Sequence, residues 1–270
     1  MGLMLCGTAN SACALWLEEL GLRVYTAEEL SYCILKYPLL FMDELFGEAL
    51  FYFLAEGAGE TVLAAELREL SAAGVDRTVL LSKIPEAIGY CNAQEAARFR
   101  LGLQKLKSLS QAEYWKKKGD FLFSLRKFGK AVAVYERVLN GELSGGISLS
   151  LRGRLLCGEG CAYANLFLSE KAYRCFVEAY ELLKDRNILK RIYFLSLIEP
   201  TIGVRERYLS AVEGETQLSW DREYEEARQR AASGAESRRV AEIFKGDPVQ
   251  RAAAAAETVR RWKEEYRSML

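Results

Sequence analysis

The stretch from Ala112 to Leu139 constrains the fold of this chain more than any other. Trp115 is followed four residues later by Gly119, Ala131 lies twelve residues after that glycine, and Tyr135 lies four residues after the alanine. Glycine and alanine lack bulky side chains, so two helices that meet at these positions can approach closely. The stretch is therefore predicted to form two helices folded back on each other.

A second stretch repeats this pattern 41 residues further along the chain. Gly160 is followed twelve residues later by Ala172, and Phe176 again lies four residues after the alanine. The segment between the copies, Asn140–Gly146, has the glycine-rich composition of a loop. The centre of the chain is therefore predicted to contain two copies of one helical hairpin.

These spacings resemble the tetratricopeptide repeat, in which two antiparallel helices make up one repeat of about 34 residues. The resemblance implies that the first helix of each repeat lines a concave groove, which in this family binds a protein or peptide. The side chains that the resemblance places in the groove are Lys116, Asp120, Ser124, Arg154 and Asn165.

The pattern departs from the family in several places. Lys118 stands where the family prefers leucine, Leu156 stands where it has tryptophan, and neither copy has the closing proline. Asp120 and Cys161 occupy the position at which the family's peptide-carboxylate clamp uses asparagine. The resemblance therefore extends to the groove and not to that clamp.

The rest of the chain is also predicted to be helical, because it has only four prolines and is rich in Ala, Leu, Glu, Arg and Lys. Helices should begin at the capping boxes Thr26–Glu29 and Asn92–Glu95 and at Asp247–Pro248. Pro38 and Pro85 should end helices. The predicted fold is all-α: a tetratricopeptide-like solenoid with an N-terminal helical region and a long C-terminal helix that runs to about Met269.

Three regions follow from this pattern: an acidic N-terminal helical region at 1–91, the repeats at 92–200, and a C-terminal helical extension at 201–270. The first region is either a set of further degenerate repeats or a separate small bundle. Two repeats are too few to bury a core alone, so flanking helices such as Arg186–Ile198 should complete the stack. The last helix either caps the stack with a polar face or serves as an arm for a partner or for self-association.

Charge is unevenly spread, although the net charge is zero. Residues 1–75 carry 11 acidic and 3 basic side chains, whereas residues 76–140 carry 6 acidic and 13 basic ones. The stretch 98–130 interleaves basic and aromatic residues, a composition that can bind single-stranded nucleic acid. The same aromatics fall at helical core spacing, so packing is the competing interpretation.

Chemistry-bearing patterns are scarce. The chain has no histidine, which removes the commonest general base and metal ligand. Seven cysteines, an odd number, indicate reduced thiols rather than a disulfide framework, and the pair Cys157 and Cys161 is two ligands short of a zinc site. Leu3–Cys6 lacks the apolar run of a lipoprotein signal, and no stretch is long and apolar enough to span a membrane. We therefore expect a cytoplasmic protein that is not an enzyme and uses no cofactor or metal.

The sequence thus predicts a non-catalytic scaffold that binds a protein or peptide partner, with an acidic partner favoured by the basic central region. The alternative is a helical protein that binds nucleic acid through residues 98–130. An enzyme with a histidine-free site is the third possibility, and the absence of catalytic motifs speaks against it.

Overall fold

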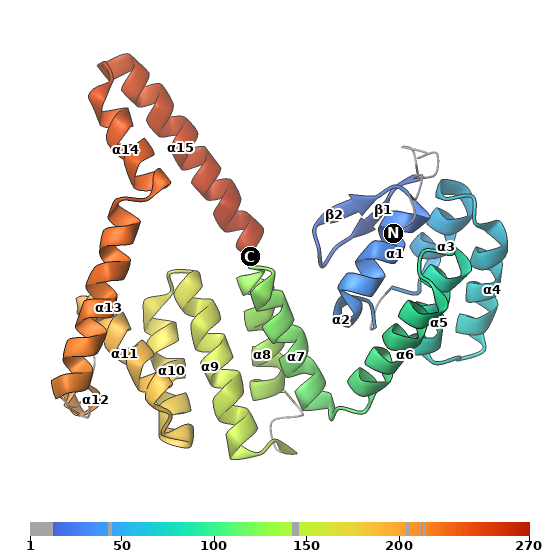
Figure 1. Ribbon diagram of the computed structural model, residues 1–270, viewed down its shortest axis with the longest axis horizontal. Coiled ribbons are helices and arrows are strands. Elements are labelled where there is room, and N and C mark those ends of the chain that lie inside the picture. Colours follow the sequence, from blue (N-terminus) through green and yellow to red (C-terminus); the bar gives the residue numbers. More distant parts are fainter. Residues whose placement is uncertain (1–12, 43–44, 142–145, 204–205, 211, 213) are drawn as a thin grey trace. The chain divides into compact units, whose positions relative to one another are not determined.

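The computed structural model describes residues 13–42, 45–141, 146–203, 206–210, 212 and 214–270. In these residues the chain is mostly helical, with helices α1 to α15 and one two-stranded antiparallel sheet (Figure 1). The chain divides into two compact units, Met1–Ser110 and Gln111–Leu270. The three regions expected from the sequence remain a prediction about separate domains. The Leu3–Cys6 segment lies outside the described residues, as does most of the predicted loop between the repeats.

The first unit begins with a β-hairpin and continues as short helices. Its elements are β1 (Leu15–Leu17), β2 (Leu22–Val24), α1 (Ala27–Lys36), α2 (Pro38–Phe41), α3 (Glu48–Tyr52) with a π-helical turn over Phe53–Gly57, α4 (Thr61–Ala72), α5 (Arg77–Ala87) and α6 (Ala93–Lys107).

The hairpin corrects the expectation of an all-α chain. Leu15 pairs with Val24 and Leu17 with Leu22. Leu15, Leu17 and Val24 are buried, whereas Trp16 is exposed. This alternation has the period of two that a half-buried strand requires.

The predicted helix starts are largely confirmed. Asn92 and Glu95 form the full capping box. Thr26 accepts a hydrogen bond from Glu29 N, but the Glu29 carboxylate accepts from the N–H of Tyr25, one residue before the cap. Pro38 opens α2 directly after α1, whereas Pro85 lies inside α5 and does not end it. Proline removes only its own N–H bond and has a helical φ, so one in the last turn leaves two further residues helical.

In the second unit, five helices pack in chain order, each against the next: α7 (Gln111–Ser124), α8 (Phe128–Asn140), α9 (Leu149–Asn165), α10 (Ser169–Leu183) and α11 (Arg186–Ile198). Figure 1 shows them side by side as successive antiparallel helices. This sequential packing is consistent with helical repeats.

The hairpins α7–α8 and α9–α10 share one geometry. A Cβ on Gly119 would lie 2.5 Å from Cε1 of Tyr135, and a Cβ on Gly160 would lie 2.7 Å from Cε1 of Phe176. Both glycines are therefore required by a close approach of an aromatic ring from the second helix. The facing alanines, Ala131 and Ala172, are both fully buried.

The two inter-helix loops match as well. Arg126 has φ 60° and Phe167 has φ 59°, so each loop places one residue in the left-handed region. Each loop is closed by a backbone bond of 2.9 Å, from Lys127 N to Leu122 O in the first and from Leu168 N to Tyr163 O in the second. The two hairpins are therefore copies of one another at a spacing of 41 residues.

The chain continues as a 3-10 turn (Pro200–Ile202), α12 (Glu206–Leu209), α13 (Gly214–Ala232), α14 (Ala235–Lys245) and α15 (Pro248–Met269). As predicted, Asp247 caps α15, and its carboxylate accepts from the N–H groups of Val249 and Gln250. No sequence signal marks α14, because this helix starts at a glycine without a side-chain cap and buries none of its residues.

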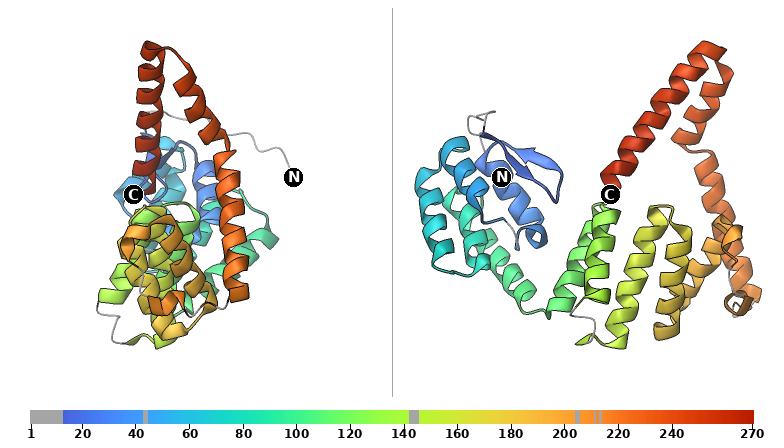
Figure 2. Two further views of the ribbon diagram at one scale, coloured as in Figure 1. Left: turned by 90° about the vertical axis from the view of Figure 1, so that its left-hand side faces the viewer. Right: turned by 180° about the vertical axis from the view of Figure 1, so that it is seen from behind.

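The end of α15 returns to the first hairpin (Figure 2). Lys127 Nζ donates to the carbonyl oxygen of Ser268 at 3.0 Å. A Cβ on Gly129 would lie 2.5 Å from the carbonyl oxygen of Leu270, so α8 and the end of the chain are in direct contact. Among the described residues, no helix combines the length and the apolar character needed to cross a membrane.

Candidate functional site

A pocket of about 340 Å³ opens between α7, α9 and α11, and we call it the inner pocket. Its walls come from these three helices, and α8 and α10 each contribute one side chain. The lining residues are Lys116, Asp120, Phe123, Tyr135, Arg154, Cys157, Gly158, Cys161, Leu183, Asp185, Ile188 and Arg191.

The Tyr135 ring packs between the two helices that form most of this pocket, α7 and α9. The ring projects from α8 and lies against glycines of both neighbouring helices. A Cβ on Gly119 would meet Cε1 at 2.5 Å, and a Cβ on Gly158 would meet Cζ at 2.9 Å. Because both positions lack a side chain, α7 and α9 come close enough for their outward-facing residues to share one pocket.

On α7, the polar residues of the pocket form a bonded set. Lys116 Nζ lies 2.5 Å from Asp120 Oδ2, and the Tyr135 hydroxyl donates to Asp120 Oδ1 at 2.8 Å. Burial, followed by the charge of Asp120, raises the pKa of Tyr135, so its hydroxyl remains a proton donor. Asp120 is therefore held from two sides.

On α9, the equivalent positions carry thiols. Cys157 corresponds to Lys116 and Cys161 to Asp120 at the 41-residue spacing. Arg191 Nη1 of α11 lies 2.7 Å from Cys157 Sγ. The hydrogen bond from Cys161 and the nearby guanidinium of Arg191 outweigh burial and lower the pKa of Cys157 to about 7. The same thiol–thiol bond, together with burial, raises the pKa of Cys161.

Arg154 supplies an accessible positive charge at the pocket. Its side chain is exposed and has no ion-pair partner among the described residues. Asp185, the N-cap of α11, lies on the same rim and uses its carboxylate to accept from Asn187 N at 2.7 Å. Three basic side chains thus face two acidic ones around the inner pocket.

The five residues predicted from the sequence are therefore placed differently. Lys116, Asp120 and Arg154 come together in the inner pocket. Ser124 and Asn165, at equivalent positions of the two copies, are not among its lining residues. Each hydrogen-bonds to its own helix, Ser124 Oγ to Phe121 O at 2.6 Å and Asn165 Nδ2 to Cys161 O at 2.9 Å.

The sequence alone does not indicate that Arg191 contributes to the pocket. It indicates Cys157 and Cys161 only as an incomplete zinc site, not as thiols in contact with an arginine. The i,i+4 spacing of Cys157 and Cys161 was visible in the sequence, but no pattern pairs either thiol with an arginine 30 or more residues away. Only the folding of the stack, in which α11 packs against α10, brings Arg191 to Cys157.

Two buried charges also lie at equivalent positions, Lys118 in the first copy and Glu159 in the second. They are only 5% and 6% exposed. The Lys118 ammonium lies 5.0 Å from the centre of the Trp115 ring, a cation–π contact. Burial raises the pKa of Glu159 to about 7, against the hydrogen bond that Cys175 donates to it. These groups are in the core between helices and do not line the inner pocket.

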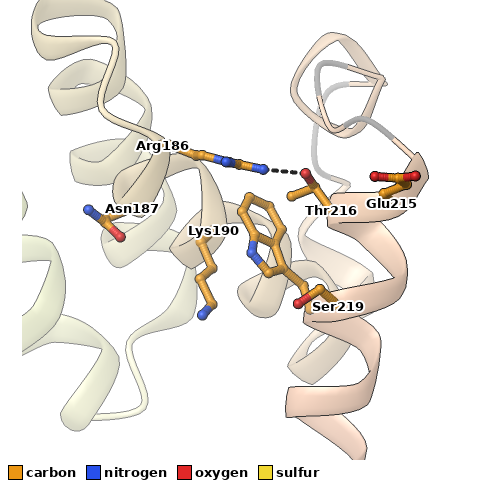
Figure 3. Close-up of a pocket in the computed structure, with 7 residues that line it drawn as sticks. Arg186, Asn187, Lys190, Glu215, Thr216 and Ser219 are labelled. Carbon is orange, nitrogen blue, oxygen red and sulfur yellow. Dashed lines mark hydrogen bonds between the residues drawn. The ribbon is translucent and has the colours of Figure 1, made fainter.

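A second pocket, of about 460 Å³, lies between α11 and α13 (Figure 3). Arg186 spans it and donates a hydrogen bond to the Thr216 hydroxyl, drawn as the dashed line in Figure 3. Lys190 forms an ion pair with Glu223. Its two basic side chains already have partners, which makes this pocket a weaker candidate for binding an acidic group.

The basic stretch 98–130 is distributed between the two units, with α6 in the first and α7 in the second. Arg100 pairs with Glu86, Lys107 with Asp76 and Lys116 with Asp120. Lys118 is buried. Four of the ten basic side chains in this stretch are therefore paired or buried.

Comparison with family models, with curated proteins and with solved structures finds no match for this chain. Among the described residues, no group of three or more Cys, Asp or Glu side chains is arranged to hold a metal ion. The inner pocket is therefore the feature of the described residues from which we infer a function.

Proposed function

We propose that this chain is a non-catalytic, tetratricopeptide-like scaffold that binds a protein or peptide partner in the inner pocket. One observation carries the proposal: α7, α9 and α11, which are alternate helices of the sequential stack, all contribute side chains to one pocket. In the family that the sequence resembles, the first helices of successive repeats form the binding groove in this way.

The partner chemistry follows from the lining. Arg154 and Arg191 supply positive charge, since Lys116 is paired with Asp120, and the apolar surface of Phe123 and Ile188 lies in the same pocket. An acidic segment that also carries an apolar side chain would complement both features. Arginine is suited to this role because its guanidinium can bind a carboxylate through two parallel hydrogen bonds.

Two features support a binding role over a catalytic one. The charged group in contact with Cys157 is a guanidinium, which stabilises a thiolate but cannot take a proton from a substrate and return it, as a general acid–base does. The carboxylates of the pocket are already engaged, Asp120 by Lys116 and Tyr135 and Asp185 by the cap of α11.

Affinity capture with charge-reversal variants tests this proposal. The full chain, Arg154→Glu and Arg174→Glu would each be used to capture partners from native cell extract at low salt. The captured material is then washed with salt, and protein and nucleic acid are identified separately. Arg174 is a matched control because it is an exposed arginine on α10 that does not line the pocket.

We expect one defined protein to be retained through the wash by the unmodified chain and by Arg174→Glu, and to be lost with Arg154→Glu. Nucleic acid that is released by the wash, with no protein enriched, would overturn the proposal in favour of the basic stretch. Such binding would weaken steeply with salt concentration, because counterions are released when phosphates are neutralised.

A further inference from the structure

The thiol pair of the inner pocket has chemistry that partner binding does not use. We propose that Cys157 is a modification site, a thiolate that hydroperoxides oxidise to sulfenic acid. The proposal concerns the reactivity of the isolated protein and does not depend on the identity of a partner.

Geometry activates this thiol and leaves it accessible. Cys157 is half-buried and lines an open pocket, so a molecule as small as hydrogen peroxide can reach its sulfur. Arg191 Nη1 lies 2.7 Å from that sulfur and stabilises its negative charge. Reactive cysteines in general occupy such electropositive, partly exposed surroundings, whereas buried structural thiols are inert.

The charged side chains that line the pocket around Cys157 come from α7, α9 and α11 with its cap. From α11 and its cap come Arg191 and Asp185, which act in opposite directions on the thiolate. From α7 come Lys116 and Asp120, which neutralise one another. From α9 itself come Arg154, on the rim, and Cys161, which donates a hydrogen bond to the sulfur. The thiolate is thus stabilised chiefly by Cys161 and Arg191.

The magnitudes favour reaction. A thiol with a pKa of about 7 is roughly half ionised at pH 7, whereas one at 9.0 is about 1% ionised, a difference of roughly 50-fold in thiolate. Intrinsic nucleophilicity falls as the pKa falls, and with a Brønsted coefficient of about 0.45 the loss over this range is about 8-fold. The gain in thiolate therefore outweighs the loss of nucleophilicity at pH 7.

The reaction is a two-electron oxidation. The Cys157 thiolate attacks one oxygen of the peroxide, an S–O bond forms and the O–O bond breaks. The sulfur is oxidised to sulfenic acid, and the departing hydroxide takes up a proton to become water.

Cys161 does not readily convert the product into a disulfide. Residues at i and i+4 of a helix have Cβ atoms about 5–6 Å apart, and a disulfide needs about 3.5–4.5 Å. While α9 is intact, the sulfenic acid of Cys157 should therefore persist long enough to be trapped.

The test is site-resolved mass spectrometry of the purified full chain. The rate of alkylation by iodoacetamide is measured at each cysteine from pH 5 to 9. In a parallel experiment, sulfenic acid formed by hydrogen peroxide is trapped with dimedone. Cys91 is the internal control, because it is also half-buried and burial raises its pKa. The variants are Arg191→Gln and Arg191→Lys, with Arg174→Gln as the matched arginine control.

We expect the alkylation rate of Cys157 to rise with a midpoint near pH 7 and to exceed that of Cys91 several-fold at pH 7, with dimedone adducts concentrated at Cys157. Arg191→Gln should move the midpoint toward 9, Arg191→Lys should move it less, and Arg174→Gln should leave it unchanged. A midpoint near 9 in the unmodified chain, or dimedone labelling no greater at Cys157 than at Cys91, would overturn the proposal. The unmodified chain alone decides this point, so it holds even if an Arg191 variant fails to fold.

Discussion

The two hairpins of the second unit have the same framework and carry different chemistry on it. In α7–α8, the pocket-lining positions one turn apart are Lys116 and Asp120, which form an ion pair. In α9–α10, the equivalent positions are Cys157 and Cys161, a thiol pair that contacts Arg191. The glycine, the facing alanine and the aromatic ring that hold each hairpin together are conserved between the copies in kind and in spacing.

This comparison separates two sets of positions. The internal set fixes how closely the helices approach, and so it tolerates little change. The outward-facing set is free to vary. In the first copy it consists of the ion pair Lys116–Asp120, and in the second it consists of the thiols Cys157 and Cys161. If the internal sets are equivalent, matched substitutions in the two hairpins should change the free energy of unfolding by similar amounts. Substitutions at the outward-facing positions should have different effects in the two hairpins.

The largest effect should come from removing the aromatic rings. Tyr135→Ala and Phe176→Ala should each lower the free energy of unfolding by about 3–5 kcal/mol, because each leaves a cavity in a packed core. Tyr135→Ala should be the costlier change, since its ring contacts glycines on two helices and its hydroxyl bonds Asp120. Urea unfolding followed by circular dichroism measures both. A loss below about 1 kcal/mol for either variant would show that its hairpin does not depend on the ring.

The buried carboxyl group of Glu159, in the second hairpin, should make the stability of the chain depend on pH. The folded-state pKa of Glu159 is raised from 4.5 to about 7, so the folded chain binds a proton more tightly than the unfolded chain. Its contribution to stability is therefore present below pH 4.5 and is lost as the pH rises to about 7, by an amount on the order of 3 kcal/mol. Unfolding of the unmodified chain and of Glu159→Gln would be compared across this range. The difference in stability between the two should change with pH, and parallel curves would contradict the raised pKa.

The glycines should be equivalent in the two copies and unlike a glycine outside them. Gly119→Ala and Gly160→Ala should each lower the free energy of unfolding by about 1–3 kcal/mol, because the added methyl group overlaps a ring. Gly102→Ala, in α6, is the matched control, since no atom lies within 4 Å of its Cβ position. That change should stabilise the chain by about 0.5–1 kcal/mol through helix propensity. If all three glycine variants changed the free energy of unfolding in the same direction, close approach would not be the reason for Gly119 and Gly160.

The smallest effect concerns the hydroxyl that only one copy has. Tyr135→Phe removes the bond to Asp120 and should cost about 1 kcal/mol. Phe176→Tyr should not recover that amount, because Cys161 stands where Asp120 does in the first copy. In the double variant Cys161→Asp/Phe176→Tyr, a coupling energy of about 1 kcal/mol in a double-mutant cycle would show that the frameworks are interchangeable. A coupling energy of zero would show that the second hairpin cannot reproduce the bond between Tyr135 and Asp120.

Much of the second unit could be predicted from the sequence, because the glycine–alanine–aromatic spacing depends on local helix geometry. The same reasoning placed Lys116, Asp120 and Arg154 on one face but could not foresee Arg191, whose position depends on how α11 packs in the stack. The β-hairpin at Leu15–Val24 was missed because each strand has only three residues, too few for an alternating pattern to stand out. The prediction that Pro85 ends a helix was wrong, because a proline in the last turn removes only one backbone hydrogen bond.

The most direct test of the account is to ask which surface touches the partner. A photo-crosslinking benzoylphenylalanine would replace Phe123, which lines the inner pocket, or Phe167, which is 82% exposed and lies outside it. Each chain would be irradiated in native extract, with and without Arg154→Glu. The account predicts that position 123 crosslinks to a protein, that Arg154→Glu abolishes this crosslink, and that position 167 gives none. A protein crosslinked from position 167 and not from position 123 would contradict binding at the inner pocket.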